Sequence, residues 1–125
     1  MIKKEISEVV SKRITLHIED DFGTQKCWDR EIEILTRDMT ETIKFIENDC
    51  SDDIFCWIGE VFEDIAEKTQ SSEFIETIKQ RAKKIVNSEQ RHSVEIDIRY
   101  AEHKLFDIAQ LESKQRSWCD RVFNN

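Results

Sequence analysis

The chain has 125 residues, of which 37% are charged and 38% hydrophobic, and its formal net charge is −8 at pH 7. This length fits one domain, and the hydrophobic share is too large for a disordered acidic tail. The chain has no Pro and only two Gly, so it lacks the residues of tight β-turns and flexible linkers. The composition therefore predicts a single all-α domain over residues 1–125.

The negative charge is concentrated in the first part of the chain. Residues 1–70 contain 9 Lys and Arg against 18 Asp and Glu, a net charge of −9, whereas residues 71–125 contain 10 against 9, a net charge of +1. Charge of one sign lowers folding stability through self-repulsion and attracts partners of the opposite sign. We expect a basic protein partner, and a sequence pI near 4.9 argues against direct nucleic-acid binding.

Targeting signals and cysteine usage indicate in which cellular compartment the protein is expected. The N-terminus has no apolar run typical of a signal peptide, and no apolar stretch reaches the roughly 18 residues of a membrane span. We therefore expect a cytoplasmic protein that does not contact a membrane. Cys27, Cys50, Cys56 and Cys119 match no zinc-site spacing. Because cytosolic disulfides are rare, free thiols are expected, with a Cys50–Cys56 bridge as the short-range alternative.

The N-terminal segment is ambiguous. Apolar side chains at positions 2, 6, 9 and 10 follow a helical pattern, whereas residues 14–18 alternate apolar and polar side chains as a half-buried strand does. The sequence leaves helix and strand open for residues 14–18.

The next two elements are predicted helices. Apolar side chains recur every three or four residues from Trp28 to Ile46, which predicts one amphipathic helix. Polar residues then break the pattern, and Ser51 or Asp52 is placed to cap the following helix. That helix is expected over residues 54–66, and its apolar arc is wide enough to pack against more than one neighbour.

Two further helical patterns complete the chain. After a polar break at residues 70–72, an amphipathic helix is predicted over residues 74–86, with basic side chains toward its C-terminal end, where the helix dipole favours them. A helical stripe then runs from Val94 to Ile108 and can continue through Leu111 to Val122, as one helix or two. About five antiparallel helices are expected in total.

Four acidic residues have the spacing of one helix face. Glu60, Glu63, Asp64 and Glu67 fall at i, i+3, i+4 and i+7, and the like charges four residues apart repel one another. A solvated face is the simpler interpretation, but the repulsion favours a functional use. Trp57 borders this ridge, either as an interface anchor or as a core residue. The candidate partner-binding residues are Trp57, Glu60, Glu63, Asp64, Glu67, Asp49, Asp52 and Asp53.

Patterns for metal binding and catalysis are weak. Only Glu89 and His92 have the Glu-x-x-His spacing of helical di-iron sites, and one such pair is not a site. The acidic loop at residues 48–53 lacks the Gly and the distal Glu of an EF-hand. The sequence has no Gly-rich phosphate loop and no Gly-x-Ser-x-Gly motif. We predict no metal, no cofactor and no catalytic residue, with a carboxylate-based enzyme as a less favoured alternative.

The segment CWIGEVFEDIAEKTQS at residues 56–71, followed by residues 74–75 and 81–84, resembles small helical bacterial immunity proteins of polymorphic toxin systems, including those of contact-dependent growth inhibition. The similarity covers about residues 54–100. It implies a protein that binds the toxin domain of its own strain and blocks the active site or substrate access. Many such toxins are nucleases with cationic grooves, which implies a basic toxin. The alternative is an acidic adaptor or DNA mimic that binds a host nucleic-acid-binding protein.

Overall fold

The computed structural model describes the backbone of residues 2–123 and the side chains of residues 2–105. Over these residues the secondary structure is entirely helical, which confirms the all-α prediction. No helix in this part of the chain combines the length and the apolar character that crossing a membrane requires. The elements are α1 (Ile2–Thr15), α2 (Asp21–Arg37), α3 (Met39–Asn48), α4 (Asp52–Ile58), the 3-10 turn η1 (Gly59–Val61), α5 (Phe62–Thr69), α6 (Ser72–Ala82) and α7 (Ser88–Phe123).

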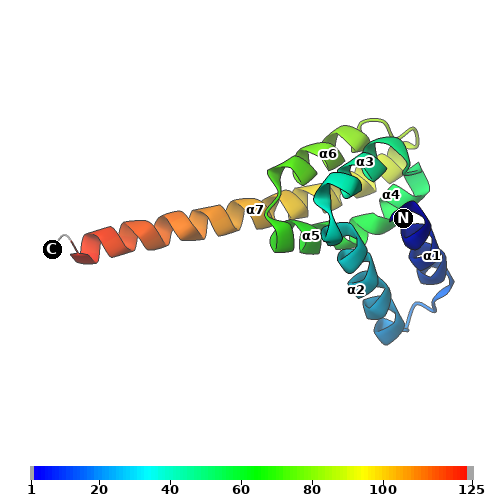
Figure 1. Cartoon of the computed structure of the whole chain (residues 1–125), viewed down its shortest axis with the longest axis horizontal. Helices are drawn as coiled ribbons and strands as arrows, with labels where there is room; N and C mark the ends of the chain where they lie inside the picture. Colours follow the sequence, from blue (N-terminus) through cyan, green and yellow to red (C-terminus); the bar gives the residue numbers. More distant parts are fainter. Residues whose placement is uncertain (1, 124–125) are drawn as a thin grey trace.

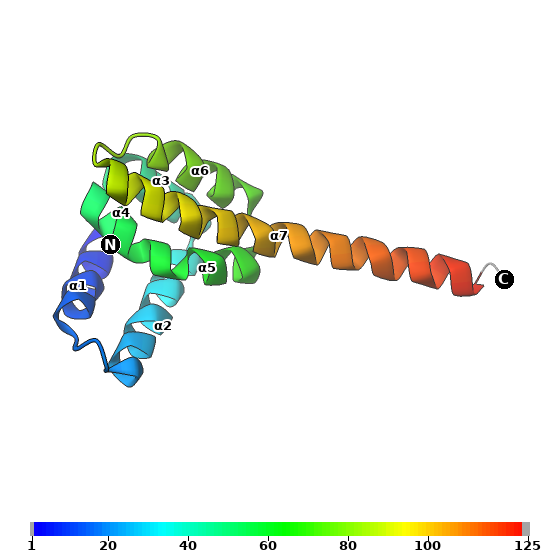
Figure 2. The same cartoon turned by 180° about the vertical axis from the view of Figure 1, so that it is seen from behind.

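Helices α4, α5 and α6 pack against the first part of α7. Helices α5 and α6 pack along it, and α3 packs against α6. Helices α1 and α2 form a hairpin that projects to one side of this body (Figure 1). Helix α7 is a single helix of 36 residues, so residues 88–123 form one helix rather than two. Its C-terminal part extends away from the other helices in both views (Figures 1 and 2).

One apolar core connects these helices. Phe62 of α5 lies between Phe55 of α4 and Phe74 of α6, with ring centroids 5.3 and 5.8 Å apart. Each large apolar side chain that is fully buried stabilises the fold by roughly 1.5–3 kcal/mol. Fully buried residues from the remaining helices complete the core, among them Ile6, Ile34, Leu35, Ile46, Val94 and Ala101.

The single helix predicted over residues 28–46 is wrong, because Asp38 divides it into α2 and α3. The backbone of Asp38 is extended (φ −146°, ψ 102°), and its carboxylate accepts a hydrogen bond from the N–H of Glu41 (3.3 Å). The buried Thr42 hydroxyl donates to the carbonyl of Leu35 (2.8 Å) across the break. The apolar spacing runs through the break, so periodicity alone does not reveal it.

The helix predicted over residues 54–66 is also interrupted. It comprises α4, the turn η1 and α5, with Gly59 at the junction. A Cβ atom on Gly59 would lie 2.7 Å from the Asp97 carboxylate, so the glycine allows α7 to approach η1 closely. Of the two predicted candidates for the cap of α4, Ser51 and Asp52, Ser51 is the cap, because it accepts from the N–H of Ile54 (3.2 Å).

The ambiguous residues 14–18 form no strand. Helix α1 ends at Thr15, and the following residues turn into α2. Asp20 caps α2 by accepting from the N–H of Gly23 (2.8 Å). The alternating apolar side chains Ile14 and Ile18 are 53% and 92% exposed, so the pattern buries no face.

The described cysteines carry no disulfide. Cys27, Cys50 and Cys56 are free thiols, which excludes the Cys50–Cys56 bridge. Cys119 and the apolar pattern expected beyond Ile108 lie outside the described side chains.

Candidate protein-binding surface

The predicted acidic ridge is not one surface, because Glu60 faces other parts of the molecule. Its carboxylate accepts hydrogen bonds from Arg13 Nε (3.1 Å) and Nη2 (2.9 Å) of α1, and from the indole N–H of Trp28 of α2 (3.2 Å). Glu60 therefore joins η1 to both helices of the hairpin. The prediction that it shares an exposed ridge with the acidic residues of α5 is wrong.

Trp57 is half-buried and packs against the core. The Arg13 guanidinium lies 5.3 Å from the centre of the Trp57 ring, within the range of a cation–π interaction. Arg13 thus pairs with Glu60 and also stacks on Trp57. The stacking gives Trp57 a structural role, because it holds the last turn of α1 against α4.

Glu31 of α2 was missed by sequence reasoning. Its side chain is fully buried, and neither carboxylate oxygen has a hydrogen-bond partner. Burial, together with the neighbouring Glu60 carboxylate, raises the pKa of Glu31 to about 8, while Arg13 acts in the opposite direction. Position 31 falls on the same face of α2 as the buried Cys27 and Leu35. The spacing of four residues between these positions is the sequence signal that could have identified Glu31 as buried.

Asp97 of α7 is a second carboxylate with a shifted pKa near Glu60. Burial raises the pKa of Asp97 to about 6, and the negative charges of Glu60 and Glu63 add to the effect. Carboxylates with a shifted pKa are candidates for catalysis when they line a cleft. Neither Glu31 nor Asp97 lines the surface cavities of about 350, 310 and 260 Å³. Within the described residues no three His, Cys, Asp or Glu side chains form a group that could hold a metal ion.

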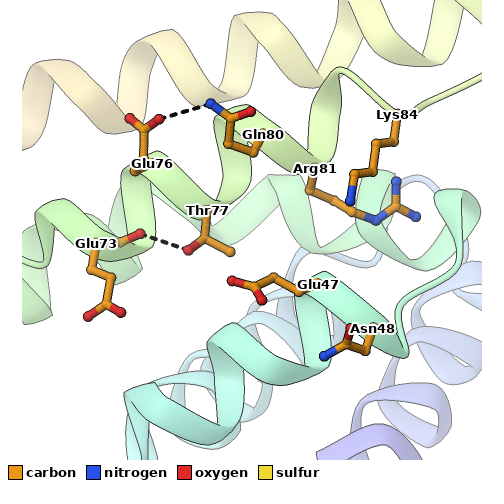
Figure 3. Close-up of a pocket in the computed structure, with 8 residues that line it drawn as sticks. All are labelled: Glu47, Asn48, Glu73, Glu76, Thr77, Gln80, Arg81 and Lys84. Carbon is orange, nitrogen blue, oxygen red and sulfur yellow. Dashed lines mark hydrogen bonds between the residues drawn. The ribbon is translucent and has the colours of Figure 1, made fainter.

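The cavity of about 350 Å³ is a groove between α3 and α6. Arg81 and Lys84 lie toward one end and Glu73 toward the other (Figure 3). Arg81 is buried and already donates to the Cys50 carbonyl (2.6 Å) and to Asp52 (2.7 Å). Among the described residues, the groove has no buried polar side chain without a partner.

The three candidate residues of the α3–α4 connection lie apart from the ridge. Asp52 holds Arg81 of α6 and accepts from the N–H of Val86 (3.4 Å). Asp53 accepts from the side chain of Gln90 (2.8 Å) on α7. Asp49 is exposed at the end of α3. Asp52 therefore links helices to one another, and only Asp49 and Asp53 are open to solvent.

The remaining candidates do form a surface, which extends onto a second helix. Glu63, Asp64 and Glu67 lie on α5, and Asp29 on the adjacent α2 is close enough to raise the pKa of Asp64. Burial, Glu63 and Glu67 contribute more to that shift, and Lys104 opposes it. We call Asp29, Glu63, Asp64 and Glu67 the acidic face.

The acidic face is only partly neutralised. The Glu63 carboxylate lies 3.9 Å from the Lys104 ammonium, and both side chains are partly exposed. Asp29, Asp64 and Glu67 are exposed and form no ion pair among the described residues. Three negative charges are therefore open to a partner on this face.

Comparisons with known proteins give no match: no protein-family model, no curated protein and no solved structure matches this chain.

Proposed function

We propose that this chain is an immunity protein that binds the basic domain of a bacterial toxin and neutralises it stoichiometrically. The observation that supports the proposal most directly is the acidic face, where Asp29, Asp64 and Glu67 are exposed and form no ion pair with any residue whose side chain the structure describes. Repulsion among these charges lowers stability in the isolated chain, and a basic partner would relieve it. The resemblance over residues 54–100 supports the same function.

Inhibition would be by occlusion. If the toxin is a nuclease, the carboxylates of the acidic face would occupy the position of nucleic-acid phosphates in its cationic groove. Exposed charges steer association and can raise its rate by roughly 10- to 1000-fold. The chain would bind without catalysis, cofactor or metal. A cytoplasmic location agrees with the free thiols of Cys27, Cys50 and Cys56, because reduced thiols are typical of that compartment.

Co-expression tests this function. The proteins encoded beside this chain are expressed one at a time in a bacterial host, with and without the chain. We expect one of them to carry a basic domain that stops growth, and the chain to restore growth and to co-purify with that domain at a one-to-one ratio. If no neighbouring product inhibits growth, or if the chain gives no protection, the proposed function is wrong.

A further inference from the structure

The turn between α1 and α2 lies at the far end of the hairpin (Figure 1). Three exposed apolar side chains lie in this turn or beside it, at the end of α1 and the start of α2. Ile14 is 53% exposed, Ile18 is 92% exposed and Phe22 is 73% exposed. We call these three residues the hairpin tip. Single exposed apolar side chains are common on protein surfaces, and Val86, at 89%, is one of them. The hairpin tip differs because it places three such side chains within nine residues.

Acidic residues predominate on the α2 side of the hairpin tip, whereas Lys12 and Arg13 precede Ile14 on the α1 side. Residues 18–29 contain four acidic side chains and one basic side chain, Lys26. The Lys26 ammonium lies 4.5 Å from the centre of the Phe22 ring, so the face of that ring already receives a cation. An aromatic anchor within a charged rim is the usual composition of a protein-binding hot spot.

The hairpin tip and the acidic face are continuous along α2. Phe22 and Asp29 are seven residues apart, which places them on the same face of the helix about 10 Å from each other. Asp29 in turn lies close enough to Asp64 for their charges to interact, where α2 packs against α5. The surface thus runs from exposed apolar side chains at the hairpin tip to exposed carboxylates on α5.

We infer that the hairpin tip and the acidic face form one docking surface for a basic protein, with Ile18 and Phe22 as its apolar anchors. This inference rests on the proposed function and names the surface that would carry it out. A second copy of the chain does not fit, because it would bring one acidic face against another. An anionic membrane surface is disfavoured for the same reason.

Site-specific photo-crosslinking of the full chain tests this surface in cells of the organism that encodes it. Benzoylphenylalanine replaces Phe22 in one variant and Val86 in a control variant. Both positions are highly exposed, so the fold should tolerate both replacements. A third variant combines the crosslinker at position 22 with Asp29→Asn, Asp64→Asn and Glu67→Gln.

We expect position 22, and not position 86, to crosslink to a protein of net positive charge, and the yield to fall about 10-fold or more in the neutralised variant. No crosslink at position 22, an equal crosslink at position 86, a crosslink to a second copy or to lipid, or a yield unaffected by neutralisation would overturn the inference. A basic partner that does not inhibit growth would leave the docking surface standing while contradicting the proposed toxin neutralisation.

The anchors are then tested with the captured partner in purified form. Phe22→Ala should speed dissociation about 10-fold or more, as expected for an aromatic hot-spot residue, while Val86→Ala should have no effect. Equal dissociation rates for the Phe22→Ala and Val86→Ala variants would show that the tip does not contact the partner.

Discussion

Glu31 is a buried carboxylic acid, and its protonation state links pH to stability. Burial raises its pKa from the ordinary value of 4.5 to about 8. Between these values the unfolded chain has released the proton that the folded chain retains. The stabilising contribution of the protonated side chain is therefore fully present below pH 4.5 and is lost as the pH rises toward 8.

Glu31→Gln should remove this pH dependence, because the amide does not titrate. Urea unfolding at pH 6 and pH 8 measures it: the wild-type free energy of unfolding should fall between the two values, and that of the variant should fall less. Asp97 contributes little to the change in stability between pH 6 and pH 8, because its raised pKa of about 6 affects stability mainly at lower pH. Glu47→Gln, at an exposed position of α3, serves as the control. The same decline in Glu31→Gln as in the wild type would show that Glu31 is ionised in the folded protein.

Glu60 is a structural residue, and its replacement should affect stability rather than binding. Glu60→Gln removes the charge that Arg13 pairs with in a half-buried position, so we expect a loss of about 1.5–3 kcal/mol in the free energy of unfolding. Glu67→Gln, on the acidic face, should change stability by less than about 0.5 kcal/mol. Chemical denaturation measures both variants. Equal stability of the two would contradict the role assigned to Glu60.

At the scale of elements, the periodicity of apolar residues predicts the helices, and local capping determines where they break. A polar cluster before an apolar run predicts a cap at Ser51 or Asp52, and Ser51 is the cap. Asp38 was not predicted because the apolar spacing continues across it. The burial of Glu31 and the inward direction of Glu60 depend on how α1, α2 and η1 pack together. Pairwise packing of this kind cannot be derived from the spacing within one helix.

The break at Asp38 should be measurable as a capping energy. Asp38→Ala removes the acceptor for the N–H of Glu41 and should lower the free energy of unfolding by about 1 kcal/mol. Thr40→Ala, at an exposed position of α3, should leave stability unchanged or slightly higher, because Ala favours helix. Thermal and urea unfolding compare the two. If Asp38→Ala left the free energy of unfolding unchanged, packing alone would be shown to hold the break between α2 and α3.

At the scale of the whole molecule, charged side chains that hold helices together and charged side chains that are exposed lie in different regions. Asp52 and Arg81 connect helices within the body, and Glu60 connects the body to the hairpin. Exposed carboxylates and exposed apolar side chains meet along α2 and α5, on a surface that the described residues neutralise only in part. The net charge of residues 1–70 predicted a basic partner, but the sequence did not show which carboxylates are free to meet it.

The most direct test of this account is the association rate constant between the chain and the growth-inhibiting basic domain encoded beside it. The acidic-face variant combines Asp29→Asn, Asp64→Asn and Glu67→Gln, and the control removes the same charge at exposed positions elsewhere, with Glu8→Gln, Glu89→Gln and Glu95→Gln. In low salt, we expect the acidic-face variant to associate about 10-fold or more slowly than both the wild type and the control, because it loses the steering charges. Raising the salt should slow the wild type toward the variant, since exposed charges are screened over about 10 Å at 0.1 M ionic strength. Equal association rates for the variant and the wild type in low salt would contradict the central claim that the acidic face recognises the partner.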